Sequence, residues 1–166
     1  MEGLTSLTKL QRLDLSFNKI GKLEGIVTNH LLEYIELGKN LLTDADQIQT
    51  PNNRLIMLTE LYLYDNQLRS LPKQLSFPQL KVFNINRNAD IRSIQLGFLP
   101  LLEVLNCTYC SISELGSFKG CMSLRELDVS FNEIASLNYL LQQLKMNNPY
   151  LMQVLCFNDN VFNHVP

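Results

Sequence analysis

The stretch LQRLDLSFNKI, residues 10–20, decides the fold, because LRELDVSFNEI at 124–134 repeats it with the same spacing. In both segments, apolar side chains stand at positions 1, 4, 6 and 11, and an asparagine stands at position 9. Positions 4 and 6 are two residues apart, so in a strand they point to one side, while positions 3, 5 and 7 point to the other. The pattern therefore predicts a short strand that is followed by a turn at the asparagine.

Five further segments carry this pattern: LEYIELGKNLL (32–42), LTELYLYDNQL (58–68), LKVFNINRNADI (80–91), LEVLNCTYCSI (102–112) and MQVLCFNDNVF (152–162). In the fourth copy the final apolar residue, Ile91, arrives one position late, and in the fifth a cysteine replaces the asparagine. The residues at position 9, which we call the ladder, are Asn18, Asn40, Asn66, Asn88, Cys110, Asn132 and Asn160. Their successive separations of 22, 26, 22, 22, 22 and 28 residues indicate a repeat architecture.

The motif resembles that of the leucine-rich repeat family, L-x-x-L-x-L-x-x-N/C-x-L, over about residues 4 to 162. The resemblance implies an α/β leucine-rich repeat solenoid, curved, with about seven short parallel strands on its concave face. Short helices, 3-10 helices and loops are then expected on the convex face. A single coil cannot bury its own apolar edge, so we expect residues 1–166 to form one domain of seven stacked repeats. The 22-residue period also resembles the cytoplasmic subclass that includes phosphatase-1 regulators and an axonemal dynein light chain.

The return segments between strands are less uniform. A helix is predicted over about 137–146, with Ser136 as its N-cap, from the i, i+3, i+4, i+7 spacing of Leu137, Leu140, Leu141 and Leu144. Short apolar pairs such as Leu115 and Phe118 predict helical or 3-10 turns. Residues 43–53 leave open whether a helix begins there or a loop forms.

The chain begins within a turn of the first motif and ends four residues after the last one. Terminal repeats normally carry a polar outer face, and no such hydrophilic cap is evident at either end. We therefore expect residues 1–166 to be a fragment of a longer array, in which a flanking repeat or a partner covers the end at 152–162.

The composition excludes several classes of protein. The formal net charge is −2, without the basic stripe that nucleic acids require or a polybasic run for membranes. No apolar stretch is long enough for a transmembrane helix, and the first residues do not resemble a signal peptide. The four cysteines do not form a dense disulfide framework. These features favour a reducing compartment, and the subclass resemblance implies a eukaryotic protein in the cytoplasm, with cytoskeletal, axonemal and nuclear locations left open.

Catalytic chemistry is not expected either. The chain has no glycine-rich phosphate loop, and neither His30 nor His164 supplies the base of a serine or cysteine triad. Cys107 and Cys110 form a C-x-x-C, but they fall on inward-facing positions 6 and 9, which favours small apolar core residues over a redox pair. Cys156 falls on position 5, where a free thiol would face outward. We therefore expect no catalytic residue, no metal and no cofactor.

The outward strand positions predict a partner-binding surface. A parallel sheet normally has both faces covered, so a strand face that stays open is available to a protein partner. Tyrosine is enriched at interfaces, and the acidic flanks suit a partner with a mildly basic or amphipathic segment. The predicted partner-binding residues are Tyr34, Glu36, Glu60, Tyr62, Tyr64, Asn84, Asn86, Asn106, Tyr109 and Asp128. The alternative is that aromatic and amide residues simply favour an exposed strand.

The predicted function is that of a non-catalytic protein–protein interaction module of the adaptor or scaffold type. A regulatory or targeting domain of a larger enzyme or complex is a second hypothesis. An extracellular recognition domain is a third, which the glycosylation sequon at Asn106 would favour and the missing caps disfavour. Asn88 is expected to matter less than Asn66, because the late Ile91 implies a distorted turn. Phe17 and Phe131 are expected to be structural, and the partner, organism and oligomeric state stay open.

Overall fold

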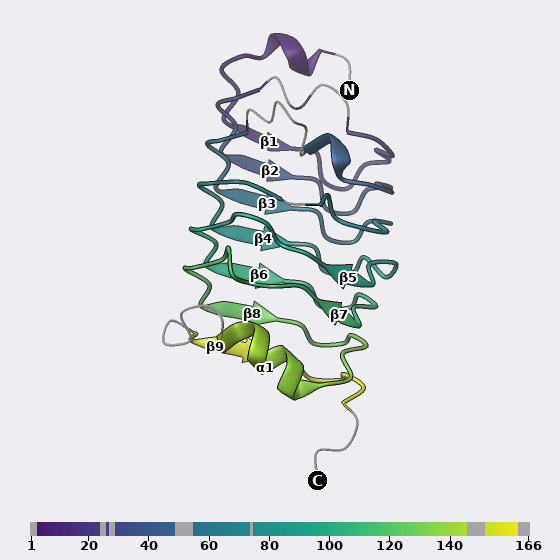
Figure 1. Cartoon of the computed structure of the whole chain (residues 1–166). Coiled ribbons are helices and arrows are strands. Elements are labelled where there is room, and N and C mark those ends of the chain that lie inside the picture. Colours follow the sequence, from purple (N-terminus) through teal and green to yellow (C-terminus); the bar gives the residue numbers. More distant parts are fainter. Residues whose placement is uncertain are drawn as a thin grey trace.

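The computed structural model is a solenoid in which one parallel sheet runs along the whole length of the domain (Figure 1). It describes residues 3–23, 26, 29–48, 55–73, 75–145 and 152–162. The seven strands of the sheet, in spatial order, are β1 (Arg12–Asp14), β2 (Tyr34–Glu36), β3 (Glu60–Tyr62), β4 (Val82–Asn84), β6 (Val104–Asn106), β8 (Glu126–Asp128) and β9 (Val154–Cys156). The predicted leucine-rich repeat solenoid is thus confirmed.

The register of the sheet follows the sequence repeat residue for residue. Leu13 pairs with Ile35 and Leu127 pairs with Leu155, so position 4 of one coil always lies beside position 4 of the next. The last pairing also shows that the seventh copy begins at Met152, which places Asn160 at the ladder position. A one-residue slip would turn every buried side chain to the other face, which explains why the register is uniform.

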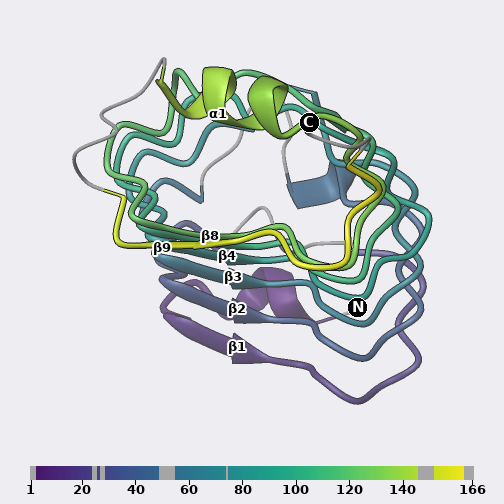
Figure 2. The same cartoon turned by 90° about the horizontal axis from the view of Figure 1, so that it is seen from below.

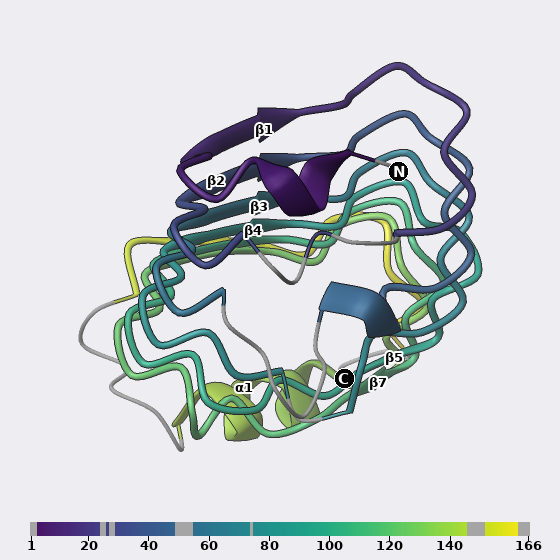
Figure 3. The same cartoon turned by 90° about the horizontal axis from the view of Figure 1, so that it is seen from above.

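The core lies between the strands and the return segments. Views along the solenoid show the strands on one side of each coil and the return segments on the opposite side (Figures 2 and 3). Leucine and isoleucine side chains from both sides fill this space, together with the fully buried rings of Phe77, Phe83 and Phe118. Burial of each such side chain stabilises the fold by about 1.5–3 kcal/mol. The apolar contacts between coils therefore account for the stacking.

The return side contains short elements of several kinds. Two 3-10 helices, η1 (Leu4–Ser6) and η3 (Asp46–Ile48), lie near the N-terminal end. Helix α1 (Leu137–Lys145) agrees with the prediction, and the hydroxyl of Ser136 accepts a hydrogen bond from the N–H of Tyr139 at 3.1 Å. Residue 146 and the predicted loop around 51–53 lie outside the described residues.

The expected helical turn at Leu115 is wrong. Strand β5 (Ser93–Ile94) pairs in parallel with β7 (Glu114–Leu115) to form a small second sheet on the return side. The ladder residues of these two coils are separated by 22 residues, without an insertion. The return segment therefore crosses the coil in an extended conformation and still buries Ile94 and Leu115. Alternation of an exposed and a buried residue in each strand is the pattern of a half-buried strand.

The ladder asparagines connect each coil to the one before it. The side-chain amide of Asn66 donates hydrogen bonds to the carbonyls of Leu37 and Leu63, both at 3.0 Å. Its oxygen accepts the N–H of Leu42 at 3.0 Å. The same arrangement recurs at Asn40, Asn88, Asn132 and Asn160. Asn18, in the first coil, is exposed and bonds only to carbonyls of its own coil.

The fourth and fifth coils depart from this arrangement together. Cys110 has no amide oxygen, and its sulfur makes only long contacts of 3.6 Å with the carbonyls of Ile85 and Thr108. The N–H of Ile91, whose counterparts elsewhere donate to the ladder residue of the next coil, donates instead to the carbonyl of Asn88 at 3.1 Å. The late Ile91 and the cysteine are thus two parts of one local change.

The residue at position 8, the third residue after the end of each strand, adopts a left-handed backbone conformation. The seven φ angles lie between 51° and 57°, at Phe17, Lys39, Asp65, Arg87, Tyr109, Phe131 and Asp159. This conformation costs a non-glycine residue about 1–2 kcal/mol. It turns the chain off the strand so that the following residue can point its side chain inward, which places each asparagine in the ladder.

Replacement of Asn66 or Asn88 by alanine should destabilise the domain to a similar degree. Asn88 is fully buried and makes the complete set of ladder bonds, so the late Ile91 does not weaken the bonds of Asn88 itself. Each stranded backbone group costs about 1–3 kcal/mol, so a loss of at least ~2 kcal/mol is expected for either variant. Urea unfolding measures it, and the exposed Asn18→Ala is the matched control. An Asn88→Ala variant as stable as the control would contradict the account.

Cys110→Asn should change the stability by less than ~1 kcal/mol, because the N–H of Ile91 already has an acceptor. Deletion of Ala89 should bring Ile91 to position 11 of its repeat and leave the N–H of Ile91 without an acceptor. This should lower the free energy of unfolding by about 1–3 kcal/mol. Cys110→Asn should recover most of that loss in the deletion background. A thermodynamic cycle from urea unfolding tests the coupling, and additive effects would mean that the two changes are unrelated.

Candidate partner-binding face

Positions 3, 5 and 7 of the strands point away from the core and form one surface, which we call the strand face. It corresponds to the predicted concave face. In β3, β4, β6 and β8 the middle residue is buried while both its neighbours are partly exposed. The strands alone cover this side of the coils in the described residues (Figure 2). The strand face is therefore accessible along the domain.

Position 5 has a structural role that the sequence analysis did not anticipate. The N–H groups at positions 6 and 8 donate to the next strand, as Leu15 does to Glu36 at 2.9 Å, which leaves the N–H at position 7 without a strand partner. A short polar side chain at position 5 accepts this N–H, at 2.9 to 3.2 Å, in Asp14, Asn84, Asn106 and Asp128. Such a bond between an Asp or Asn side chain and the N–H two residues later is a common local motif.

Three predicted partner-binding residues therefore stabilise their own turns. Asn84, Asn106 and Asp128 lie on the strand face where they were expected, each partly exposed, and each uses a side-chain oxygen for the backbone. The hydroxyl of Ser16, followed by this backbone bond, lowers the pKa of Asp14. The sequence signal was available, since a short polar residue recurs three positions before the left-handed residue.

The aromatic side chains gather on β2 and β3. The rings of Tyr34 and Tyr62 lie 5.6 Å apart between centroids, and the guanidinium of Arg12 lies 3.8 Å above the Tyr34 ring. The hydroxyl of Tyr62 donates a hydrogen bond of 2.7 Å to Glu60. Burial, followed by the hydrogen bond and charge of Glu60, raises the pKa of Tyr62, so the phenol stays protonated at neutral pH. The ring is thereby held in one orientation.

Tyr64 lies across the glycine of the preceding strand segment. A Cβ atom on Gly38 would overlap the Tyr64 ring, so the ring rests directly on the glycine backbone. The N–H of Gly38 donates to the carboxylate of Glu36 at 2.9 Å, which places this carboxylate next to the ring. Burial and then the charge of Glu36 raise the pKa of Tyr64.

We call this group the tyrosine patch; it consists of Arg12, Tyr34, Glu36, Gly38, Glu60, Tyr62 and Tyr64. The rings of Tyr62 and Tyr64 lean toward β2, where they contact Tyr34 and Gly38. Glu36, expected as an exposed border residue, is only 8% exposed. Asn86 is partly exposed beside the patch.

Tyr109 does not belong to the strand face. It has the left-handed conformation of position 8 and stacks on Phe131, with ring centroids 4.1 Å apart and planes inclined by 7°. Arg87 lies 4.9 Å above the Tyr109 ring, and Lys39 lies 4.6 Å above that of Phe17. Phe17 is 69% exposed and Phe131 is 39% exposed on the same rim, so neither ring belongs to the core.

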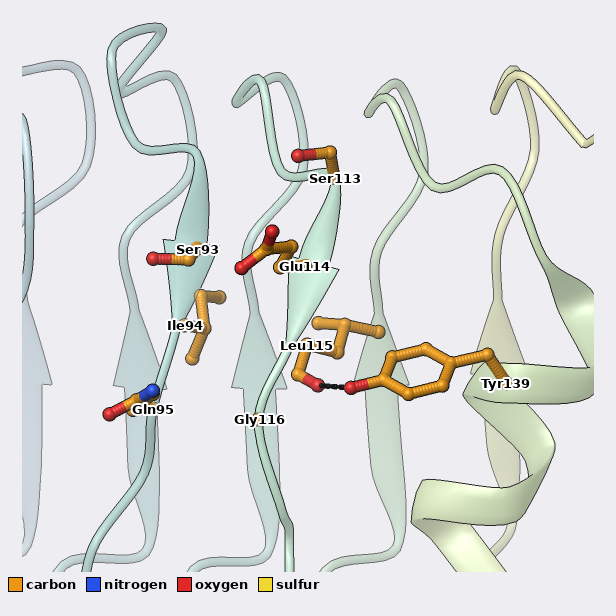
Figure 4. A pocket seen from close by; sticks show the side chains of 8 residues that line it. All are labelled: Ser93, Ile94, Gln95, Ser113, Glu114, Leu115, Gly116 and Tyr139. Carbon is orange, nitrogen blue, oxygen red and sulfur yellow. Dashed lines mark hydrogen bonds between the residues drawn. The ribbon is translucent and has the colours of Figure 1, made fainter.

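A pocket of about 160 Å³ opens on the return side between β5, β7 and α1 (Figure 4). The hydroxyl of Tyr139 donates to the carbonyl of Leu115 at 2.6 Å and so covers the edge of the small sheet. Among the described residues, which do not include His164, the lining serines have no histidine beside them, since His30 lies in a turn before β2. In that part of the chain the pocket holds no catalytic group of residues.

The cysteines do not form a reactive or metal-binding site in the described part of the chain. Cys107, Cys110 and Cys121 are buried free thiols, and burial raises the pKa of Cys110 to about 11 and that of Cys121 to about 12. Such thiols remain protonated at neutral pH. Cys156 lies partly exposed in β9. Among the described residues, no three His, Cys, Asp or Glu side chains are grouped to hold a metal ion, and no helix is long and apolar enough to span a membrane.

Replacement of Glu36 by glutamine should raise the stability of the domain at neutral pH. Burial, reinforced by the charge of Asp14, raises the pKa of Glu36 above its unfolded value. A raised carboxyl pKa means that the stabilising protonated form exists below the unfolded pKa and is lost as the pH rises through the folded pKa. Glutamine keeps an oxygen for the N–H of Gly38 and carries no charge.

The melting temperature of Glu36→Gln should therefore exceed that of the wild type at pH 7, and the difference should shrink as the pH falls to about 4. Thermal unfolding followed by circular dichroism between pH 4 and 8 measures this. Glu126→Gln, at position 3 of β8, is the matched control and should show little difference at any pH. A Glu36→Gln variant that melts below the wild type at pH 7 would mean that the charge stabilises the fold.

Comparisons with known proteins agree with the repeat. A family model described as "Leucine Rich repeat" matches residues 6–23 and 120–136. The chain is 33% identical over 155 residues to lumican from Coturnix japonica, a match that covers 83% of this chain and 44% of lumican. The functional domain of InlJ from Listeria monocytogenes has the same fold, with a TM-score of 0.78 at 24% identity over 98% of this chain and 33% of that chain.

The chain thus spans less than half the length of both of these proteins. Neither is a member of the cytoplasmic subclass that the motif resembles, and that finer resemblance is not confirmed. Leucine-rich repeat proteins of this kind are non-enzymatic interaction modules. The chain thus has the repeat motif and the solenoid fold of leucine-rich repeat proteins.

Proposed function

We propose that the domain is a protein–protein interaction module of the adaptor or scaffold type, which binds a partner protein on its strand face. The observation that carries this proposal is the tyrosine patch on a sheet face that the described chain leaves open. Tyr34, Tyr62 and Tyr64 are partly exposed although their rings contact one another or the backbone. Aromatic side chains of this kind are typical anchors of interfaces.

The order of the patch before binding supports the proposal. Tyr62 is held by Glu60, Tyr34 by Arg12, and Tyr64 by the surface of Gly38. Rings that are already fixed lose little conformational entropy when a partner covers them. Elsewhere on the strand face, Asp14, Asn84, Asn106 and Asp128 at position 5 are committed to backbone hydrogen bonds, which leaves the patch as the most distinctive part of this face.

The acidic groups around the rings favour a partner with a mildly basic or amphipathic segment. Asp14, Glu36 and Glu60 all lie within or next to the patch, and Arg12 alone among the patch residues carries a positive charge. Complementary charge speeds association and excludes wrong partners. A nucleic acid or an anionic membrane would be repelled by this surface.

The location of the protein stays a proposal. The cytoplasmic subclass resemblance favours an adaptor inside the cell, or a regulatory domain of a larger enzyme or complex. The match to lumican, an extracellular protein, favours the alternative of an extracellular recognition domain. The alternatives differ in whether the sequon at Asn106 is glycosylated. Asn106 lies on the strand face, and its side chain bonds to Thr108.

Mass spectrometry of the protein from its natural source separates these locations. An unmodified Asn106 together with four reduced cysteines is expected for a cytoplasmic adaptor. A glycan on Asn106 would place the protein in the secretory pathway and would also cover part of the strand face.

Tyr62→Ala combined with Tyr64→Ala should abolish capture of the partner. Truncation of a central interface tyrosine typically costs ~2 kcal/mol or more, about thirtyfold in affinity. Capture with cross-linking mass spectrometry and melting by circular dichroism together measure the effect. The melting temperature should change little, because both rings lie on the outside of the core.

Tyr109→Ala is the control, since it removes an exposed tyrosine that lies on the rim and not in the patch. It should capture the partner normally. Normal capture by the patch variant would instead direct the search to the return side, around residues 41–57 and 135–150.

A further inference from the structure

We propose that the tyrosine patch recognises one cationic side chain, an arginine or a lysine, that the partner protein inserts between its rings and the carboxylate of Glu36. This inference rests on the proposed function, since it names the chemistry of the segment that the strand face binds. It follows from three independent features: an incompletely bonded carboxylate, aromatic rings without a cation of their own, and an excess of negative charge.

The carboxylate of Glu36 is buried but not fully bonded. One oxygen accepts the N–H of Gly38 at 2.9 Å, and the other lies 3.5 Å from the hydroxyl of Tyr34, which is too long for a good hydrogen bond. No shorter contact to this second oxygen occurs within the described part of the chain. A buried carboxylate oxygen without a strong donor costs free energy, and a charged donor from a partner would remove that cost.

The rings around Glu36 can receive a cation. Arg12 already lies 3.8 Å above Tyr34, which shows that a guanidinium packs on this surface. On the rim, Phe17 and Tyr109 likewise have a cation of this chain above them. In the described residues, Tyr62 and Tyr64 have none, although they lie beside the carboxylates. A cation over a tyrosine ring is attracted by the ring, and the attraction is stronger where water is excluded.

Charge decides between a cation and a purely apolar group. Asp14, Glu36 and Glu60 give the patch and its border three acidic groups against the single guanidinium of Arg12. The charge of Asp14 contributes to the raised pKa of Glu36, and Glu36 contributes to that of Tyr64, so these fields overlap at one place. An apolar side chain would cover Glu36 without pairing it, whereas an ammonium or guanidinium would pair it.

The probe is the blocked peptide acetyl-Ala-Arg-Ala-Arg-Ala-amide, compared with the same peptide carrying glutamine in place of arginine. Binding is followed by nuclear magnetic resonance, through the amide of Gly38, which reports directly on the Glu36 carboxylate. The arginine peptide should give saturable shifts at Gly38 and Tyr64, and the glutamine peptide should not. Equal shifts from the two peptides would overturn the proposal.

Glu36→Gln combined with Glu60→Gln should weaken binding of the arginine peptide about tenfold or more, which corresponds to about 1.4 kcal/mol. Both substitutions conserve shape, and each glutamine oxygen can still accept the local hydrogen bond. Glu126→Gln is the control for the general negative charge of the strand face and should bind as the wild type does. A loss with Glu126→Gln as large as with the double variant would reduce the effect to nonspecific attraction and refute a site.

Gly38→Ala tests the geometry without a change of charge. The added methyl group meets the outer atoms of the Tyr64 ring, which can swing away, so the fold should be retained. Displacement of the ring should reduce binding of the arginine peptide severalfold. Unchanged binding would show that the Tyr64 ring does not form part of the site.

The two proposals fail separately. If the arginine peptide does not bind while Tyr62→Ala and Tyr64→Ala still abolish partner capture, the strand face binds its partner without a cation. If the peptide binds at the patch but the tyrosine variant captures the partner normally, the cation site is real and the natural partner docks elsewhere.

Discussion

The side-chain amide of the ladder asparagine is the interaction on which the rest of the molecule depends. Each amide bonds to the turn of its own coil and to two backbone groups of the coil before it, as Asn66 does with Leu37 and Leu42. These bonds fix the distance and the angle between coils. Together with the buried strand positions, they maintain the uniform register of the strand pairs and hence the continuity of the strand face. The left-handed residue before each asparagine is the conformational cost of this arrangement.

The sequence was sufficient for the part of the structure that repeats. Because the buried positions fix the register, a motif alignment predicted which side chains are buried, which face outward and where the last coil begins. Contacts that break the repeat could not be predicted in this way. The Tyr64 ring lies over Gly38 because the glycine has no side chain, and this contact depends on two coils together. The backbone bond of the Asp or Asn at position 5 was not anticipated, although the recurrence of a short polar residue there was a signal for it.

The tyrosine patch illustrates how a regular scaffold acquires a specific surface. Every coil supplies the same backbone, so differences along the strand face come from side chains alone. Glu36 and Tyr62 occupy position 5, where four of the other five coils have Asp or Asn and the seventh has Cys156. Glu36 still bonds to the N–H of Gly38, but its longer side chain brings a carboxylate beneath aromatic rings. The local hydrogen bond of position 5 is thus kept, but the longer side chain also buries a charge, which destabilises the fold.

The junction between the fourth and fifth coils bears on the stiffness of the whole domain. At Cys110 the hydrogen bonds on the ladder side are weak, which would make this junction the easiest place for the solenoid to bend. The small sheet of β5 and β7 joins the same two coils on the opposite side. The second sheet compensates for the weak ladder contacts at this junction, so the solenoid keeps its resistance to bending there. The domain can therefore present all of its strands to a large partner as one rigid body.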